Sequence, residues 1–76
     1  MSPSLIRLAF ENVAPHITNL AYIKKLIERA DTASDQPVYQ IRFLERELKN
    51  NDITLRTDIH ILINELRYLM KRMPSK

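Results

Sequence analysis

The sequence predicts an all-α fold, a small bundle of three to four helices that forms a homodimer. Three observations lead to this prediction. The 76 residues include no glycine, and tight hairpins between β-strands favour Asn-Gly or Asp-Gly turns. Apolar residues recur at steps of three and four in several segments, as they do along one face of a helix. The chain also has no cysteine, so a core of this size needs another source of stability, for which association of two copies is the leading candidate.

Within one domain of residues 1–76, the expected helical segments are 3–13, 17–30, 37–50 and 54–73. In the first, Ser2 is the expected N-cap, and Pro3 occupies the first helical position, where its missing N–H costs nothing. Pro15 disfavours helical geometry at Ala14 and so ends or kinks this helix. The expected inner face of the first segment consists of Leu5, Leu8 and Val13.

The segment from Leu5 to Phe10 allows one alternative. It could pair as a short β-strand in a ribbon-helix-helix dimer, with the next two helices following. The alternation of apolar and polar residues is imperfect there, and a helix-start signal precedes the segment. Both observations favour a helix.

The second and third segments are amphipathic, and a polar link separates them. Residues 31–36 are rich in side chains that compete for backbone hydrogen bonds, and Pro37 after them suits the first turn of a helix. Glu45 stands four residues before Lys49, in the favourable orientation for an ion pair along one helix. The expected apolar stripes are Leu20, Ile23, Ile27 and Ala30 in the second segment and Ile41, Leu44 and Leu48 in the third.

The last segment has the strongest helical pattern, because its apolar residues follow one another by steps of four and three without interruption. These residues are Leu55, Ile59, Leu62, Leu66, Leu69 and Met73. Asp52 or Thr54 can cap the start of this helix. Lys71 and Arg72 suit the negative end of its dipole, and Pro74 ends it.

Composition argues against catalysis and against sites for cofactors, metals or small-molecule substrates. Phosphate-cradling loops, dinucleotide fingerprints, nucleophile elbows and calcium loops all need glycine, which is missing. A Ser–His–Asp arrangement would have to be assembled from flexible ends, because the serines are confined to the termini and the link. They are Ser2, Ser4, Ser34 and Ser75.

The two histidines do not suggest a different conclusion. Neither His16 nor His60 has the His-x-x-x-His or Glu-x-x-His spacing of a helical metal site. The residues after His60 also lack the lysine and glycine typical of a histidine-phosphotransfer site. We therefore expect both histidines to be exposed to solvent, and we expect no enzyme activity, cofactor or metal.

No apolar run approaches the length that spans a bilayer, and the first residues lack the basic, apolar and small-residue regions of a signal peptide. We therefore expect a soluble protein located in the cytoplasm, without a membrane partner. The net charge is +3 at pH 7, which permits either nucleic acid or an acidic protein surface as a partner.

Additional apolar residues on the last two segments predict contact with another protein. Each segment carries a pair of large apolar residues outside its core stripe, and a bundle this small has too few neighbouring helices to cover two stripes per helix. We expect these pairs to mediate self-association or binding of another protein. The residues are Tyr39, Phe43, Ile61 and Tyr68. If the assigned faces are rotated, the same residues are instead inner positions of the core.

Basic residues on the same two segments support a second hypothesis. On the last helix, Asp58 and Glu65 fall on the side opposite a basic sector that also contains His60. If the basic sectors of the two helices adjoin, they make a surface that can follow a phosphate backbone. The candidate nucleic-acid-binding residues are Arg42, Arg46, Lys49, Arg56, Arg67 and Lys71. The simpler interpretation is that these are solvated residues whose charges are paired between helices.

The preferred interpretation is a small non-catalytic regulatory or adaptor protein that forms a homodimer and binds another protein through its helices. The alternative is a small dimeric DNA-binding transcriptional regulator that uses the basic face of the last two helices. A helix-turn-helix motif is not recognisable, because the turn at residues 49–52 lacks the usual glycine.

Overall fold

The computed structural model describes residues 4–50 and 52–72. It contains four α-helices, and the described residues form no strand. Two short 3-10 helices, η1 and η2, extend the ends of α1 and α3. The bounds are α1 Leu5–Val13, η1 Ala14–His16, α2 Leu20–Ala33, α3 Pro37–Glu47, η2 Leu48–Asn50 and α4 Ile53–Arg72. The all-α prediction is therefore confirmed, the β-strand alternative at Leu5 to Phe10 is wrong, and the homodimer stays a prediction.

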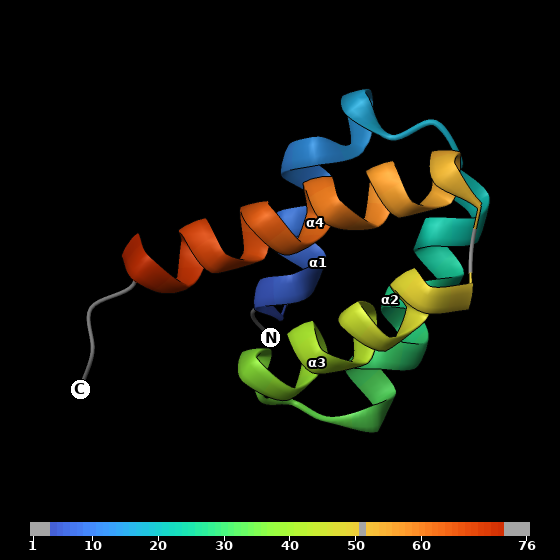
Figure 1. Ribbon diagram of the computed structural model, residues 1–76. Helices are drawn as coiled ribbons and strands as arrows, with labels where there is room; N and C mark the ends of the chain where they lie inside the picture. Colours follow the sequence, from blue (N-terminus) through green and yellow to red (C-terminus); the bar gives the residue numbers. More distant parts are fainter. Residues whose placement is uncertain (1–3, 51, 73–76) are drawn as a thin grey trace.

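Helix α4 organises the bundle (Figure 1). It crosses α1, against which it packs most extensively, and it also packs against α3. Helix α2 packs against α1 and α3, so that all four helices enclose a single core. The carboxyl-terminal end of α4 extends past the other helices in Figure 1, and the molecule measures 38 × 24 × 21 Å.

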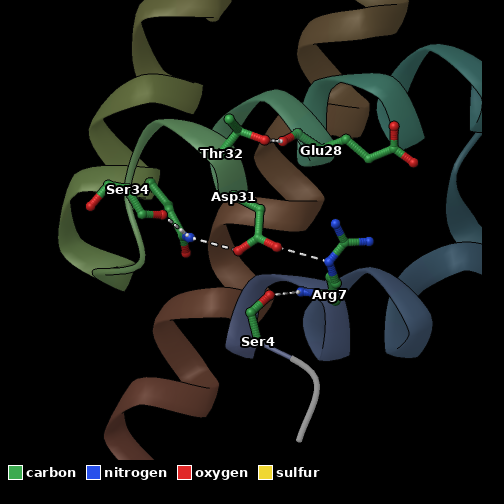
Figure 2. Close-up of polar contacts among 7 residues, drawn as sticks. Ser4, Arg7, Glu28, Asp31, Thr32 and Ser34 are labelled. Carbon is green, nitrogen blue, oxygen red and sulfur yellow. Dashed lines mark hydrogen bonds and ion pairs between the residues drawn. The ribbon is translucent and has the colours of Figure 1, made fainter. Parts of the chain in front are cut away.

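Local hydrogen bonds determine where the helices begin and end. The side chain of Ser4 caps α1 by accepting from the backbone N–H of Arg7 (Figure 2). The expected cap Ser2, with Pro3, lies outside the described residues. Helix α4 begins after Asp52, whose carboxylate accepts from the N–H of Leu55 at 3.1 Å. Of the two caps considered for α4, the structure therefore selects Asp52. The expected ends of α4 at Met73 and Pro74 lie outside the described residues.

Helix α2 is shifted towards the carboxyl terminus relative to the expected range 17–30, because it spans Leu20–Ala33. Ile17 is buried in an extended conformation between η1 and α2. At the other end, the hydroxyl of Thr32 donates to the carbonyl of Glu28 at 2.8 Å, which keeps this residue within the helix (Figure 2). The polar link therefore contains only residues 34–36.

The core confirms most of the predicted stripes and corrects the face of α1. Leu8, expected inside, is 37% exposed, whereas Ile6 and Ala9 are completely buried together with Val13. Leu5 packs against the core only in part, so the buried face of α1 is centred on Ile6, Ala9 and Val13. Leu20 was also placed inside incorrectly and is 47% exposed, because it occupies the first position of α2. The buried apolar residues of the other helices are Ile23, Leu26, Ile27, Ala30, Ile41, Leu44, Ile59, Leu62, Ile63 and Leu66.

Asp58 is a buried carboxylate, and its predicted place on an acidic outer flank is wrong. Only 1% of the residue is exposed. Its carboxylate accepts from the backbone N–H groups of Thr18 and Asn19 at 3.0 and 2.8 Å, and from the side-chain amide of Asn19 at 3.0 Å. Buried backbone N–H groups need such an acceptor. Asp58 thus joins the second turn of α4 to the segment that leads into α2.

A second polar network joins α1, α2 and α3. Gln40, which is 1% exposed, donates from its amide to the backbone carbonyl of Ser34 at 2.6 Å and to the carboxylate of Asp31 at 3.2 Å. The other oxygen of Asp31 accepts from the guanidinium of Arg7 at 2.8 Å (Figure 2). This network fixes the start of α3 against the end of α2.

Replacement of Asp58 by alanine is expected to lower the free energy of unfolding by about 3 kcal/mol, because two backbone N–H groups lose their acceptor. The matched control is Asp52→Ala, which removes an exposed helix cap and costs about 1 kcal/mol. Urea denaturation of both variants measures the difference. A loss for Asp58→Ala no larger than that for Asp52→Ala would contradict the structural role assigned to Asp58.

The corrected face of α1 is tested by two truncations. Ile6→Ala leaves a cavity in the core and is expected to lower the free energy of unfolding by about 3 kcal/mol. Leu8→Ala removes a partly exposed side chain and is expected to cost less than about 1 kcal/mol. Thermal unfolding followed by circular dichroism gives both values. A larger loss for Leu8→Ala than for Ile6→Ala would contradict the corrected face and support the face expected from the sequence.

Candidate functional site

A groove between α3 and α4 is the candidate functional site. It has a volume of about 500 Å³ and lies between α3 and the carboxyl-terminal part of α4. Helix α3 supplies one wall and α4 supplies the other. The lining residues are Val38, Ile41, Arg42 and Glu45 from α3 and Arg67, Met70 and Lys71 from α4.

The apolar part of the groove comes from three side chains. Ile41 is buried, Met70 is partly buried against the core, and Val38 is 46% exposed. Val38 and Ile41 lie three residues apart and therefore on one side of α3. Val38 and the exposed part of Met70 therefore offer the accessible apolar surface of the groove, and the buried Ile41 lies beneath them.

The polar part of the groove is predominantly basic. Arg42, Arg67 and Lys71 are exposed, and they line the groove together with a single carboxylate, Glu45. The guanidinium of Arg67 donates to Glu45 at 2.7 Å, which connects the two walls. Both side chains of this ion pair are about half exposed, so the pair contributes little to stability. Arg42 and Lys71 have no ion-pair partner among the described residues.

Glu45 was expected to pair with Lys49 and instead pairs with Arg67. Lys49 lies in the 3-10 helix η2, where three residues make a turn, and so the α-helical spacing assumed for the pair does not hold. Lys49 lines a neighbouring hollow of about 370 Å³ together with Arg42, Glu45 and Arg46. Arg42 and Glu45 also line the groove, so the two depressions adjoin at these residues.

The structure therefore brings together five of the six candidate nucleic-acid-binding residues. Arg42, Arg67 and Lys71 line the groove, and Arg46 and Lys49 adjoin it on α3. Arg56 is exposed in the first turn of α4, roughly 17 Å along the helix from Arg67. The basic face is thus concentrated on α3 and the carboxyl-terminal half of α4.

The four candidate protein-contact residues do not line the groove. Tyr39 and Tyr68 are 57% and 52% exposed, whereas Phe43 and Ile61 are partly buried against the core. The guanidinium of Arg72 lies over the ring of Tyr68, 5.6 Å from its centroid, and donates to the phenol oxygen at 3.2 Å. Two of the four side chains therefore remain available for an intermolecular contact.

Sequence reasoning missed the apolar residues Val38 and Met70 because each lies outside its helix's main stripe. Their significance depends on how α3 and α4 lie relative to each other, which a single helix does not reveal. The spacing of Val38 and Ile41 is the one signal that could have indicated a shared face.

The histidines, the acidic residues and the lengths of the helices bear on the expectations from the sequence. Both histidines are exposed, as expected. Among residues 4–50 and 52–72, no group of three or more His, Asp or Glu side chains could hold a metal ion. None of the helices described is sufficiently long and apolar to span a bilayer.

No protein-family model, curated protein or solved structure matches the chain. The groove is therefore interpreted from its own geometry and charge.

Proposed function

We propose that the protein is a small non-catalytic adaptor or regulatory protein that binds an acidic, amphipathic segment of another protein. The observation that carries this proposal is the groove between α3 and α4, in which an apolar floor lies beside Arg42 and Lys71, two basic side chains without an ion-pair partner among the described residues. An amphipathic helix binds such grooves through apolar residues spaced three or four apart.

Charge complementarity selects the partner. Arg42 and Lys71 lack ion-pair partners among the described residues, so acidic side chains beside the apolar anchors would meet a basic rim. Complementary charges of this kind accelerate association and discriminate against basic partners. The apolar floor consists of three side chains, so the expected interface is small and the complex transient.

Selection of a random-sequence peptide library against the full chain tests this proposal. Enriched peptides are expected to be acidic and to carry apolar residues at helical spacing. Arg42→Glu combined with Lys71→Glu should weaken their binding by about tenfold or more, because two complementary charges become repulsive. Isothermal titration calorimetry of synthetic peptides measures the change.

The matched control is Lys24→Glu combined with Arg56→Glu, which changes the net charge equally at two exposed positions that do not line the groove. This control should change peptide affinity by less than about twofold. Equal weakening by both double variants would show general charge attraction and contradict the groove. Enrichment of peptides without an excess of acidic residues would contradict the proposed partner.

A DNA-binding regulator is the second candidate function. The observation favouring it is that the hollow lined by Arg46 and Lys49 adjoins the groove, because Arg42 and Glu45 line both. Random duplex DNA provides the distinguishing measurement, because binding through phosphate contacts weakens steeply with salt. Strong binding with this salt dependence, together with no peptide enrichment, would replace the adaptor proposal by this one.

The homodimer is a separate prediction, and the structure indicates which of the four candidate contact residues to substitute in its test. Phe43 packs against the core, so its substitution would disturb folding as well as association. We expect sedimentation at tens of micromolar to show a dimer that Tyr39→Ser combined with Tyr68→Ser dissociates, because both tyrosines are exposed. A monomer in the unsubstituted chain would contradict self-association.

A further inference from the structure

A second hollow lies on the side of α3 that faces α2. It has a volume of about 430 Å³ and is lined by residues of α2, α3 and η2. These are Arg29, Phe43, Arg46, Glu47 and Lys49. None of them lines the groove between α3 and α4, although Arg46 and Lys49 also line the hollow that adjoins it. An inference from this hollow does not rest on the adaptor proposal, because that proposal depends on the residues of the groove.

The hollow is rich in positive charge. Three cations, Arg29, Arg46 and Lys49, face one carboxylate, Glu47. All three cations are exposed, and none has an ion-pair partner among the described residues. The carboxylates of Asp31 and Glu45 are paired elsewhere in the structure, with Arg7 and Arg67. Like charges placed around one depression repel one another unless an anion lies between them.

The ends of the helices explain part of this charge. Arg46 lies in the last turn of α3 and Lys49 in the 3-10 helix that follows, where cations offset the partial negative charge of the helix terminus. Arg29 is different, because it reaches the same hollow from within α2. The partial charge at the end of α3 therefore does not account for the position of Arg29.

Phe43 supplies an apolar wall. It is partly buried against the core and is thereby held in place. An anion bound beside it could rest its carbon skeleton on the ring while its charged oxygens meet the guanidinium groups. The arrangement thus suits an organic anion better than a bare inorganic one.

We propose that this hollow binds the phosphate group of a phosphate monoester. Three cations and one carboxylate leave a formal charge of +2. A phosphate monoester carries between about −1.5 and −2 at neutral pH and offers three acceptor oxygens, whereas a carboxylate carries −1 and two oxygens. Guanidinium groups bind such oxygens in pairs, and Lys49 adds a further charge.

Titration of the full ¹⁵N-labelled chain with phenyl phosphate and with inorganic phosphate tests this site. Saturable shifts are expected at the backbone amides of Arg29, Phe43, Arg46 and Lys49. Phenyl phosphate should bind more tightly than inorganic phosphate, with a dissociation constant of roughly 1 mM or below, because its ring contacts Phe43. The absence of saturable shifts at these amides would overturn the proposal.

Two double variants separate a built site from general charge attraction. Arg29→Gln combined with Arg46→Gln is expected to weaken phenyl phosphate binding by about tenfold, since it removes two charge-assisted contacts. Lys24→Gln combined with Arg56→Gln lowers the net charge equally outside the hollow and should weaken binding by less than about twofold. Similar weakening by the two double variants would overturn the site. Circular dichroism confirms that each variant is folded.

The source of the phosphate is decided by a further comparison. A peptide containing phosphotyrosine that binds about tenfold more tightly than phenyl phosphate would identify a phosphorylated side chain of a protein partner. A free sugar phosphate or nucleoside monophosphate that binds more tightly than the peptide would identify a small metabolite. Either result supports the site, because the phosphate chemistry is shared.

Discussion

The buried carboxylate of Asp58 holds the backbone between η1 and α2 against the second turn of α4. Pro15 lies within η1, and residues 17–19 that follow η1 are not helical, so the N–H groups of Thr18 and Asn19 need acceptors outside their own segment. Asp58 supplies the acceptor from another helix, and the link between α1 and α2 therefore has a defined position on α4. This attachment sets where α2 begins relative to α4, the longest helix described.

The second polar network extends this constraint to α3. Gln40 is buried and bonds to Ser34 and Asp31, while Asp31 also pairs with Arg7 of α1. Helix α3 is thereby fixed against α2 at its first turns and packs along α4. The groove on one side of α3 and the basic hollow on the other are both consequences of this placement. Polar contacts between helices position the surfaces, and apolar burial supplies most of the stability.

The sequence was most informative where one physical effect dominated. Helix α4 was predictable because its apolar residues keep a helical step over its whole length, and the proline and polar residues correctly indicated the links. The face of α1 was not predictable, since burial of Ala9 in place of Leu8 depends on how closely other helices approach. Asp58 and Gln40 were missed for a related reason. A polar residue beside an apolar stripe resembles a solvated flank until the partner groups that satisfy it are known.

The candidate site was predictable in charge but not in shape. The basic character of α3 and of the end of α4 follows directly from Arg42, Arg67 and Lys71, whereas the apolar floor between them requires the relative placement of two helices. Pairing of Glu45 with Arg67 instead of Lys49 has the same origin. Contacts within one helix can be inferred from spacing, but contacts between helices depend on the packed fold.

The projecting end of α4 has a consequence for the energetics of the groove. Leu66 is the last fully buried residue described in this helix, and Met70 and Lys71 follow it one turn later. A helical end with few buried neighbours opens at a lower free energy than the core does. The α4 wall of the groove thus belongs to the part of this helix that unfolds locally at the lowest free energy. A ligand bound in the groove would therefore stabilise the helical conformation of this segment. Slower amide hydrogen exchange in the last turns of α4 would then report binding, while exchange in the core would stay unchanged.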